Sequence, residues 1–244
     1  MLFYFVFLSI SCATRLALLI KASHDATWNP SLLAVFGWGL VYDLGAASFA
    51  ALPLIVLLTA LPTGALRPGW FRWVAISLGF VILFALLFGG VAEWTFWDEF
   101  GVRFNFIAVD YLVYTTEVLG NIRESYPIPL IVSGLLAAAA VLTWLLWRMR
   151  LPHTWLDAAA EPTGPRYRHG AWYFAGALVL GLGLHTDWLP AFKNNFNREL
   201  AKNGLWSLFA AFQHNVLKYD EFYSIKPTDE AFARLRENLI ADER

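Results

Sequence analysis

Two ionisable side chains lie inside long apolar stretches of the sequence, where a charge is costly. Arg15 interrupts the first apolar run, residues 2–20, and Asp43 lies in the first half of the second, residues 31–61. A short loop joins the two runs, so both side chains can reach a similar depth in a membrane. The pattern predicts an intramembrane ion pair or a snorkelling arginine, with a role in transport or lipid-headgroup binding as the alternative.

Residues 93–127 form a second candidate region, because aromatic side chains alternate there with acids and bases. One interpretation is a pair of amphipathic helices that cap a helix bundle at the membrane interface. The other is a surface that binds a lipid headgroup or docks an extracytoplasmic domain. The residues alone leave both open.

Signatures of metal binding and nucleophilic catalysis are missing from the pattern. His24-Asp25 is an isolated dipeptide, and His153 and His169 are separated from other ligand types. The sequence has neither a glycine-rich phosphate loop nor a Gly-x-Ser-x-Gly nucleophile motif. His185 and Asp187 lie near the end of an apolar run and are expected to be structural. We expect no metal, no cofactor and no catalysis by this chain alone.

Composition indicates a lipid environment. The 244 residues are 58% hydrophobic and 15% charged, against about 45–50% and about 25% in soluble domains. A formal net charge of −1 makes nucleic acid an unexpected partner. The single cysteine, Cys12, is expected to be a small buried apolar residue.

Five segments are long and apolar enough to span a membrane: residues 2–20, 31–61, 74–92, 130–147 and 171–189. They predict an all-α polytopic bundle of about five transmembrane helices with interfacial helices, occupying residues 1–190. A cleaved signal peptide at residues 2–20 is the weaker interpretation, since no basic residue precedes the run. Pro53 predicts a kink or tilt in the second helix.

Orientation follows from the basic residues. The loops after the second and fourth segments carry six of them, and those after the first and third carry three. The positive-inside rule therefore predicts a cytoplasmic amino terminus and an extracytoplasmic segment after residue 190.

Residues 191–244 are expected to be a solvated helical linker rather than a domain. Within it, residues 200–217 have apolar side chains at helical spacing, which predicts a helix on the membrane surface or against a partner domain. A second short helix is expected at residues 229–239, capped by Thr228.

Residues 97–112, WDEFGVRFNFIAVDYL, followed by NIRESYP at 121–127, resemble the membrane-domain signature of bacterial lipoteichoic acid synthase-like, sulfatase-like proteins. Residues 199–206, ELAKNGLW, with FAAF at 209–212, are similar to the connector before their catalytic domain. The resemblance covers essentially the whole chain.

The resemblance implies five helices followed by an extracytoplasmic domain of the alkaline phosphatase superfamily. Such domains use a divalent metal, such as manganese, and a threonine nucleophile to transfer phosphoglycerol or phosphoethanolamine from a phospholipid, or to hydrolyse sulfate or phosphate esters. We expect that domain to be missing from this chain or separately encoded, so no catalytic residue is carried over. Glu124-Ser125 is no substitute for the family's nucleophile motif.

The resulting hypothesis is a membrane anchor and linker in the bacterial inner membrane, whose partners are membrane lipids and the extracytoplasmic catalytic domain. Candidate domain-docking or lipid-headgroup residues are Arg103, Asn105, Asp110 and Tyr111. The alternatives are a small transporter or channel, with Arg15, Asp43 and Glu93 along a polar path, and a stand-alone scaffold that recruits an enzyme.

Overall fold

The computed structural model of the chain describes residues 2–61, 64, 69–113, 115–149, 163–185 and 188–213. All secondary structure in these residues is helical, as predicted. One compact unit comprises Met1–Gln213, and the remainder, His214–Arg244, lies outside the described residues, as do the helix predicted at 229–239, His153 and Asp187.

Four helices are long and apolar enough to cross a membrane: α1 (Leu2–Lys21), α2 (Ser31–Ala60), α4 (Gly69–Phe100) and α7 (Ile128–Arg148). They correspond to the first four predicted spans. Few residues of α4 and α7 are buried although both helices are apolar, which is the arrangement that lipid requires. These four helices fit a membrane protein.

The fifth predicted span, residues 171–189, falls on α9 (Thr163–Gly183), which begins eight residues earlier and ends six residues earlier than expected. The shift brings Arg166, Arg168 and His169 into the helix. α9 is therefore helical as predicted but is not among the four helices that are apolar enough to span by composition.

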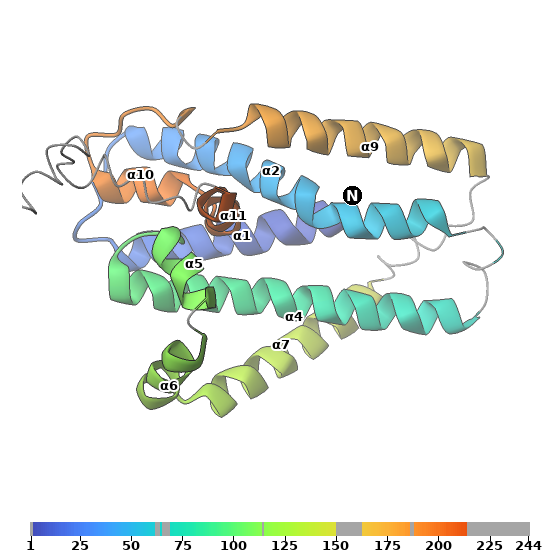
Figure 1. The fold of residues 1–244 in the computed structure, drawn as a ribbon, viewed down its shortest axis with the longest axis horizontal. Coiled ribbons are helices and arrows are strands. Elements are labelled where there is room, and N and C mark those ends of the chain that lie inside the picture. Colours follow the sequence, from blue (N-terminus) through green and yellow to red (C-terminus); the bar gives the residue numbers. More distant parts are fainter. Residues whose placement is uncertain are drawn as a thin grey trace, which may run out of the picture. The chain divides into compact units, whose positions relative to one another are not determined.

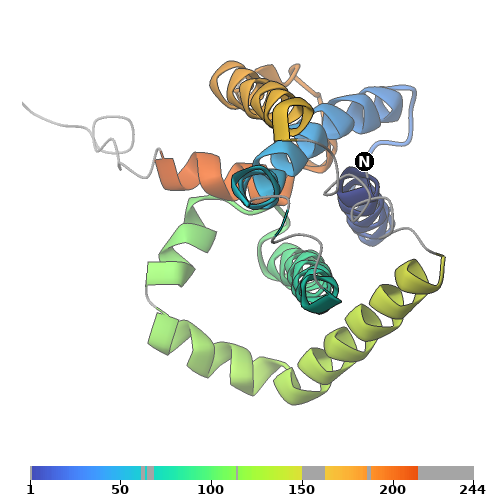
Figure 2. The same cartoon turned by 90° about the vertical axis from the view of Figure 1, so that its right-hand side faces the viewer.

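α1 is central to the packing, because it contacts both α2 and α4 (Figure 1). α9 packs along the outer side of α2, and α7 packs on α4 and diverges from it toward α6 (Thr115–Ser125). Figure 2 shows the same helices seen from one end. Gly181 of α9 faces the ring of Phe49, with no space for a side chain between them, so part of α9 packs closely on α2.

The helices alternate in direction, which gives the unit two distinct ends. At the α4 C-terminal end, Lys21 of α1 forms an ion pair with Asp98 and lies over the ring of Trp94. At the α4 N-terminal end, Arg72 lies over the ring of Trp147, 4.2 Å from its centroid. α4 and α7 are therefore antiparallel.

α2 continues as a helix through Pro53. α4 extends past the predicted end at residue 92 by two turns, so Glu93–Phe100 is helical rather than part of an external loop. After a turn at Gly101, whose φ of 65° favours glycine, the chain forms α5 (Phe106–Val113) and α6. Two short helices thus occupy most of the predicted interfacial segment.

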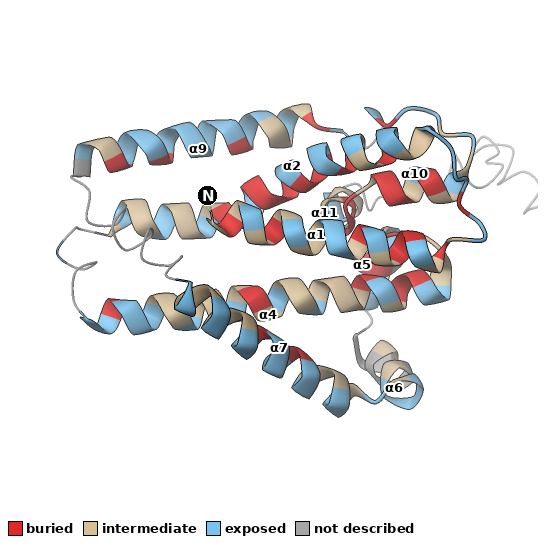
Figure 3. Ribbon diagram, turned by 180° about the vertical axis from the view of Figure 1, so that it is seen from behind, coloured by how far each residue is buried: buried red, intermediate tan, exposed pale blue. Residues whose placement is uncertain are grey.

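The chain returns to the bundle after α9. α10 (Asn195–Ala201) packs on α2 and α1, and α11 (Gly204–Gln213) packs on α5 and α2. Figure 3 shows buried residues concentrated on α1, α2 and α10, whereas α7 and α9 are largely exposed. Residues 195–201 are therefore part of the core and not a solvated linker; Leu200 and Ala201 are fully buried. Cys12 is exposed on α1, not buried as expected.

Candidate functional site

Arg15 and Asp43 form the predicted ion pair, and both side chains are 2% exposed. Arg15 Nη1 donates to Asp43 Oδ2 at 2.7 Å, and Nη2 donates to Oδ1 at 2.9 Å. This two-pronged geometry is the strongest arrangement available to an arginine and a carboxylate. The pair joins α1 to α2 within the apolar part of the bundle.

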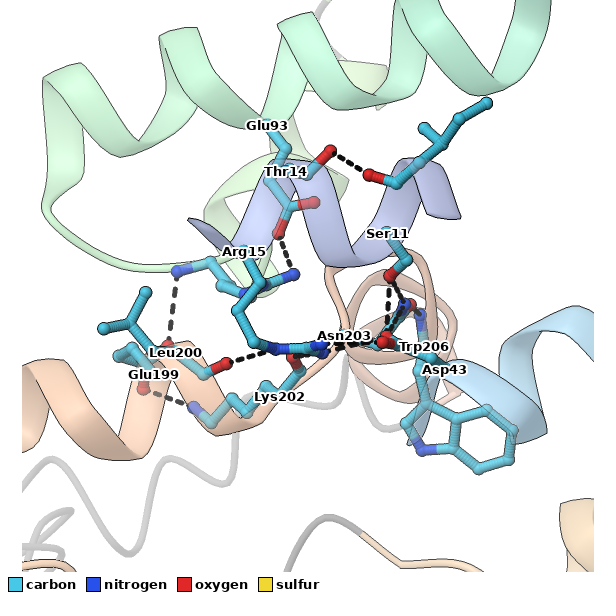
Figure 4. A network of polar contacts seen from close by, with 12 residues as sticks. Ser11, Thr14, Arg15, Asp43, Glu93, Glu199, Leu200, Lys202, Asn203 and Trp206 are labelled. Atoms are coloured by element: carbon cyan, nitrogen blue, oxygen red, sulfur yellow. Dashed lines mark hydrogen bonds and ion pairs between the residues drawn. The ribbon is translucent and has the colours of Figure 1, made fainter. Parts of the chain in front are cut away.

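Arg15 also binds the chain that follows α9. Its Nε donates to the carbonyl of Leu200 at 2.9 Å, and Nη2 donates to the carbonyl of Lys202 at 3.2 Å. Figure 4 shows the guanidinium between Asp43 and these two carbonyls. Because the last residues of α10 cannot pair their carbonyls within the helix, Arg15 acts as a C-terminal cap for it.

Asp43 accepts two further hydrogen bonds on Oδ1, from Ser11 Oγ at 2.7 Å and from Asn203 Nδ2 at 2.7 Å. Asn203 has a second role, since its Oδ1 accepts from the backbone N–H of Trp206 at 2.9 Å and so caps the start of α11. The Asp43 carboxylate therefore links α1, α2 and the α10–α11 turn.

Two glycines make this packing possible. A Cβ on Gly39 of α2 would lie less than 3.0 Å from the guanidinium of Arg15. A Cβ on Gly204 would lie less than 3.0 Å from the carboxylate of Glu93. Both buried charges are therefore packed against bare backbone, which only glycine provides.

A second buried ion pair lies beside the first. Arg103 Nη1 donates to Glu93 Oε1 at 2.7 Å, and the Arg103 side chain is 1% exposed. The backbone N–H of Arg103 donates to Glu199 Oε2 at 3.2 Å, which connects the α4–α5 turn to α10. Burial lowers the pKa of the Arg103 guanidinium below its ordinary value, and the neighbouring Glu93 carboxylate opposes that change.

The remaining predicted site residues have simpler positions. The side chain of Asn105 accepts from the N–H of Ile107 at 2.9 Å and caps α5. Asp110 and Tyr111 lie on α5, where the Tyr111 ring packs edge-on against Phe100. Tyr111 is exposed and Asp110 is half-buried, whereas Arg103 is buried. Arg103 therefore holds the turn and α10 together and offers little surface to a partner.

A pair of asparagines fixes the start of α10 to the loop between α1 and α2. Asn194 Nδ2 donates to the carbonyl of Asp25 at 2.7 Å and to Thr27 Oγ1 at 2.8 Å. Asn197, which is 1% exposed, exchanges hydrogen bonds of 3.1 Å with the backbone of Thr27 in both directions. α10 is thus tied to the bundle at both of its ends.

Several residues of this network carry no role in the sequence prediction: Ser11, Gly39, Asn194, Asn197, Glu199, Leu200, Lys202, Asn203 and Gly204. Asn203-Gly204 had a usable signal, because that dipeptide is typical of a turn and a helix start. The helical periodicity of residues 200–217 concealed it. We define these residues, together with Arg15, Asp43, Glu93 and Arg103, as the α10 seat.

The α10 seat is suited to positioning rather than to catalysis. Arg15 with Asp43 and Arg103 with Glu93 form two buried ion pairs, and the half-buried Lys202 and Glu199 form a third. In the described part of the chain, no group of three or more histidines, cysteines and carboxylates is placed to hold a metal ion. Arg15 and Arg103 also donate to residues 199–202, so the two buried pairs fix the path of the chain after α9.

Comparison with known proteins gives no relative from which a role could be transferred: no family model, curated protein or solved structure matches this chain.

Proposed function

We propose that this chain is the membrane anchor and connector of a lipoteichoic acid synthase-like, sulfatase-like protein, and that it holds an extracytoplasmic catalytic domain beside its lipid substrate. The observation that carries the proposal is the pair of hydrogen bonds from the buried Arg15 to the carbonyls of Leu200 and Lys202. A connector that simply followed α9 would not need an arginine of α1 to bind the carbonyls at the end of α10.

The α10 seat fixes the position from which the connector leaves the helix bundle. α10 is held at its start by Asn194 and Asn197 and at its end by Arg15. The side chain of Asn203 then caps the start of α11. A domain attached beyond α11 would therefore be tethered to a fixed point on the bundle. Tethering by a short linker raises the effective concentration of two sites for each other to the order of millimolar.

The parent activity would be transfer of phosphoglycerol or phosphoethanolamine from a phospholipid, or hydrolysis of a sulfate or phosphate ester, with a divalent metal in the catalytic domain. The proposed location is the bacterial cytoplasmic membrane, with the amino terminus inside and α10 outside. Two reporter enzymes can be fused after Gln213, one that works only outside the cytoplasm and one that works only inside. Only the first should be active.

The transporter alternative receives less support from the geometry. Arg15 bonds with Asp43 and Arg103 bonds with Glu93, so each of these charges lies against a counter-ion. A flux assay in vesicles separates the two functions.

The experiment begins with the transcript beyond Arg244, to obtain the longest natural product. That protein is placed in vesicles and given two substrates: a labelled phospholipid, followed by release of diacylglycerol, and a soluble aryl phosphodiester. The double replacement Arg15→Met with Asp43→Leu removes both buried charges and the donor to the carbonyls of Leu200 and Lys202. It should lower lipid turnover several-fold and leave turnover of the soluble ester unchanged. Equal turnover of the lipid by wild type and variant, at equal expression, would refute the positioning role.

A further inference from the structure

An apolar groove lies at the α4 N-terminal end of the bundle, opposite the α10 seat. It is lined by Leu2 and Phe3 of α1, Leu57 of α2, Gly79 and Leu83 of α4, and Trp147 of α7, among others. Helix lengths explain it. At a rise of 1.5 Å per residue, α1 is about 30 Å long and α4 about 48 Å. α1 ends level with α4 at the Lys21–Asp98 ion pair, so it begins part-way along α4 (Figure 1).

The groove lining has almost no polar group that could bind water. The hydroxyl of Thr143, which lies in the lining, donates to the carbonyl of Ala139 at 2.7 Å. The other lining residues are apolar or aromatic, apart from the glycine at position 79. Apolar cavities of this kind stay dry, and a void forfeits dispersion contacts along its walls. In a membrane, the groove must be filled by a hydrocarbon chain or by another helix.

Aromatic side chains place the mouth of the groove at the depth of the lipid headgroups. Trp70 and Trp73 at the start of α4, and Trp144 near the end of α7, are all exposed. Tryptophans are enriched at that level of a bilayer. The groove therefore runs from the headgroup level into the hydrocarbon.

Guanidinium groups gather at the same level. Arg72 is exposed and lies over the ring of Trp147, which lines the groove. Arg148 follows Trp147 and is also exposed. Arg166 is 6% exposed and donates to the carbonyl of Leu61 at 2.6 Å, while its Nε and Nη1 have no hydrogen-bond partner among the residues that the structure describes.

From these observations we infer that the groove binds an anionic phospholipid, with one acyl chain between α1, α2, α4 and α7 and the phosphate at Arg72. Charge complementarity decides between the two possible occupants. An anionic lipid supplies both the hydrocarbon for the groove and the negative charge for Arg72 and Arg148. A packed helix would cover these two arginines and would need acidic residues of its own at that depth. The inference is independent of the proposed anchor function.

The test uses the chain in vesicles containing a trace of phosphatidylserine or phosphatidylcholine with a photoreactive acyl chain. Phosphatidylserine avoids the headgroups proposed as substrates. The expected result is labelling of residues 71–83 and 143–147, stronger for phosphatidylserine. Each basic residue near a membrane surface contributes a factor of about five to the binding of anionic lipid. Arg72→Gln should therefore reduce phosphatidylserine labelling about fivefold and leave phosphatidylcholine labelling unchanged.

A second variant fills the groove itself. A Cβ on Gly79 meets no atom within 4 Å, and leucine has the higher helix propensity, so Gly79→Leu should fold and abolish labelling by both lipids. Gly134→Leu on α7 is the matched control, since Gly134 has the same free space but lies outside the groove lining. Arg123→Gln on α6 controls for loss of a surface charge. Equal labelling by both lipids, unchanged labelling of Gly79→Leu, or a protein–protein crosslink at Gly79 would each overturn the inference.

Discussion

Replacing Asp43 by asparagine should strongly destabilise the bundle. Asp43 accepts four hydrogen bonds, two from Arg15 and one each from Ser11 and Asn203. Without the carboxylate, the Arg15 guanidinium stays buried without its counter-ion. Removing one partner of a buried pair costs about 3–5 kcal/mol, so the unfolding equilibrium should shift by roughly two to three and a half orders of magnitude.

Asp98→Asn is the matched control for the same chemical change. Asp98 also pairs with a basic residue, Lys21, but the Asp98 side chain is 51% exposed. An exposed pair contributes about 0–1 kcal/mol. Unfolding of both variants by denaturant in mixed micelles or bicelles measures the difference. Similar midpoints for Asp43→Asn and Asp98→Asn would refute the argument from burial.

The double variant Arg15→Met with Asp43→Leu separates stability from docking of α10. It removes both charges together, and such replacements are often neutral or stabilising. The carbonyls of Leu200 and Lys202 would nevertheless lose their donor, so α10 should detach more often. Trypsin should then cut after Arg198 and Lys202 faster than in wild type, with little change in the unfolding midpoint. Unchanged cleavage would show that Arg15 does not hold α10.

Four further substitutions test other contacts by the same unfolding measurement. Gly39→Ala and Gly204→Ala should each lower the free energy of unfolding by about 1–3 kcal/mol, because the new methyl group displaces a buried charge. An unchanged free energy of unfolding would show that the helices shift apart without loss of stability. Asn197→Ala should cost about 1–3 kcal/mol, since it leaves the N–H of Thr27 without its acceptor, and trypsin should also reach α10 sooner. Gly101→Ala should cost about 1–2 kcal/mol through its positive φ alone, and a Gly101→Asn variant should recover part of that loss.

Hydropathy was sufficient to locate the apolar helices. The first four predicted spans fall on α1, α2, α4 and α7, because about 20 consecutive apolar residues have few alternatives to crossing a bilayer. The pairing of Arg15 with Asp43 was the preferred interpretation, since opposite charges at a similar depth on adjacent helices can neutralise each other, but a snorkelling arginine was an equal part of that prediction. Helix ends were less well predicted: α4 continues to Phe100 with polar residues that pack on neighbouring elements.

The α10 seat depended on contacts that hydropathy does not describe. Residues 200–217 have one helical period, but Asn203 and Gly204 divide them into the end of α10 and all of α11. Arg103, a candidate docking residue in the sequence, has a buried partner, Glu93, on a part of α4 that was predicted to be a loop. Both features depend on neighbouring elements, which the pattern of a single segment does not describe.

Local sequence therefore determined the main apolar helices, four of which are long and apolar enough to span a membrane, and that Arg15 and Asp43 need partners. Only the tertiary structure decided that Arg15 would also hold the carbonyls of Leu200 and Lys202, which follow it by 185 and 187 residues. Backbone carbonyls are the same in every residue, so no side-chain pattern marks the ones that will be bound. They are selected when the helices pack and bring a buried donor within reach of the unpaired end of α10.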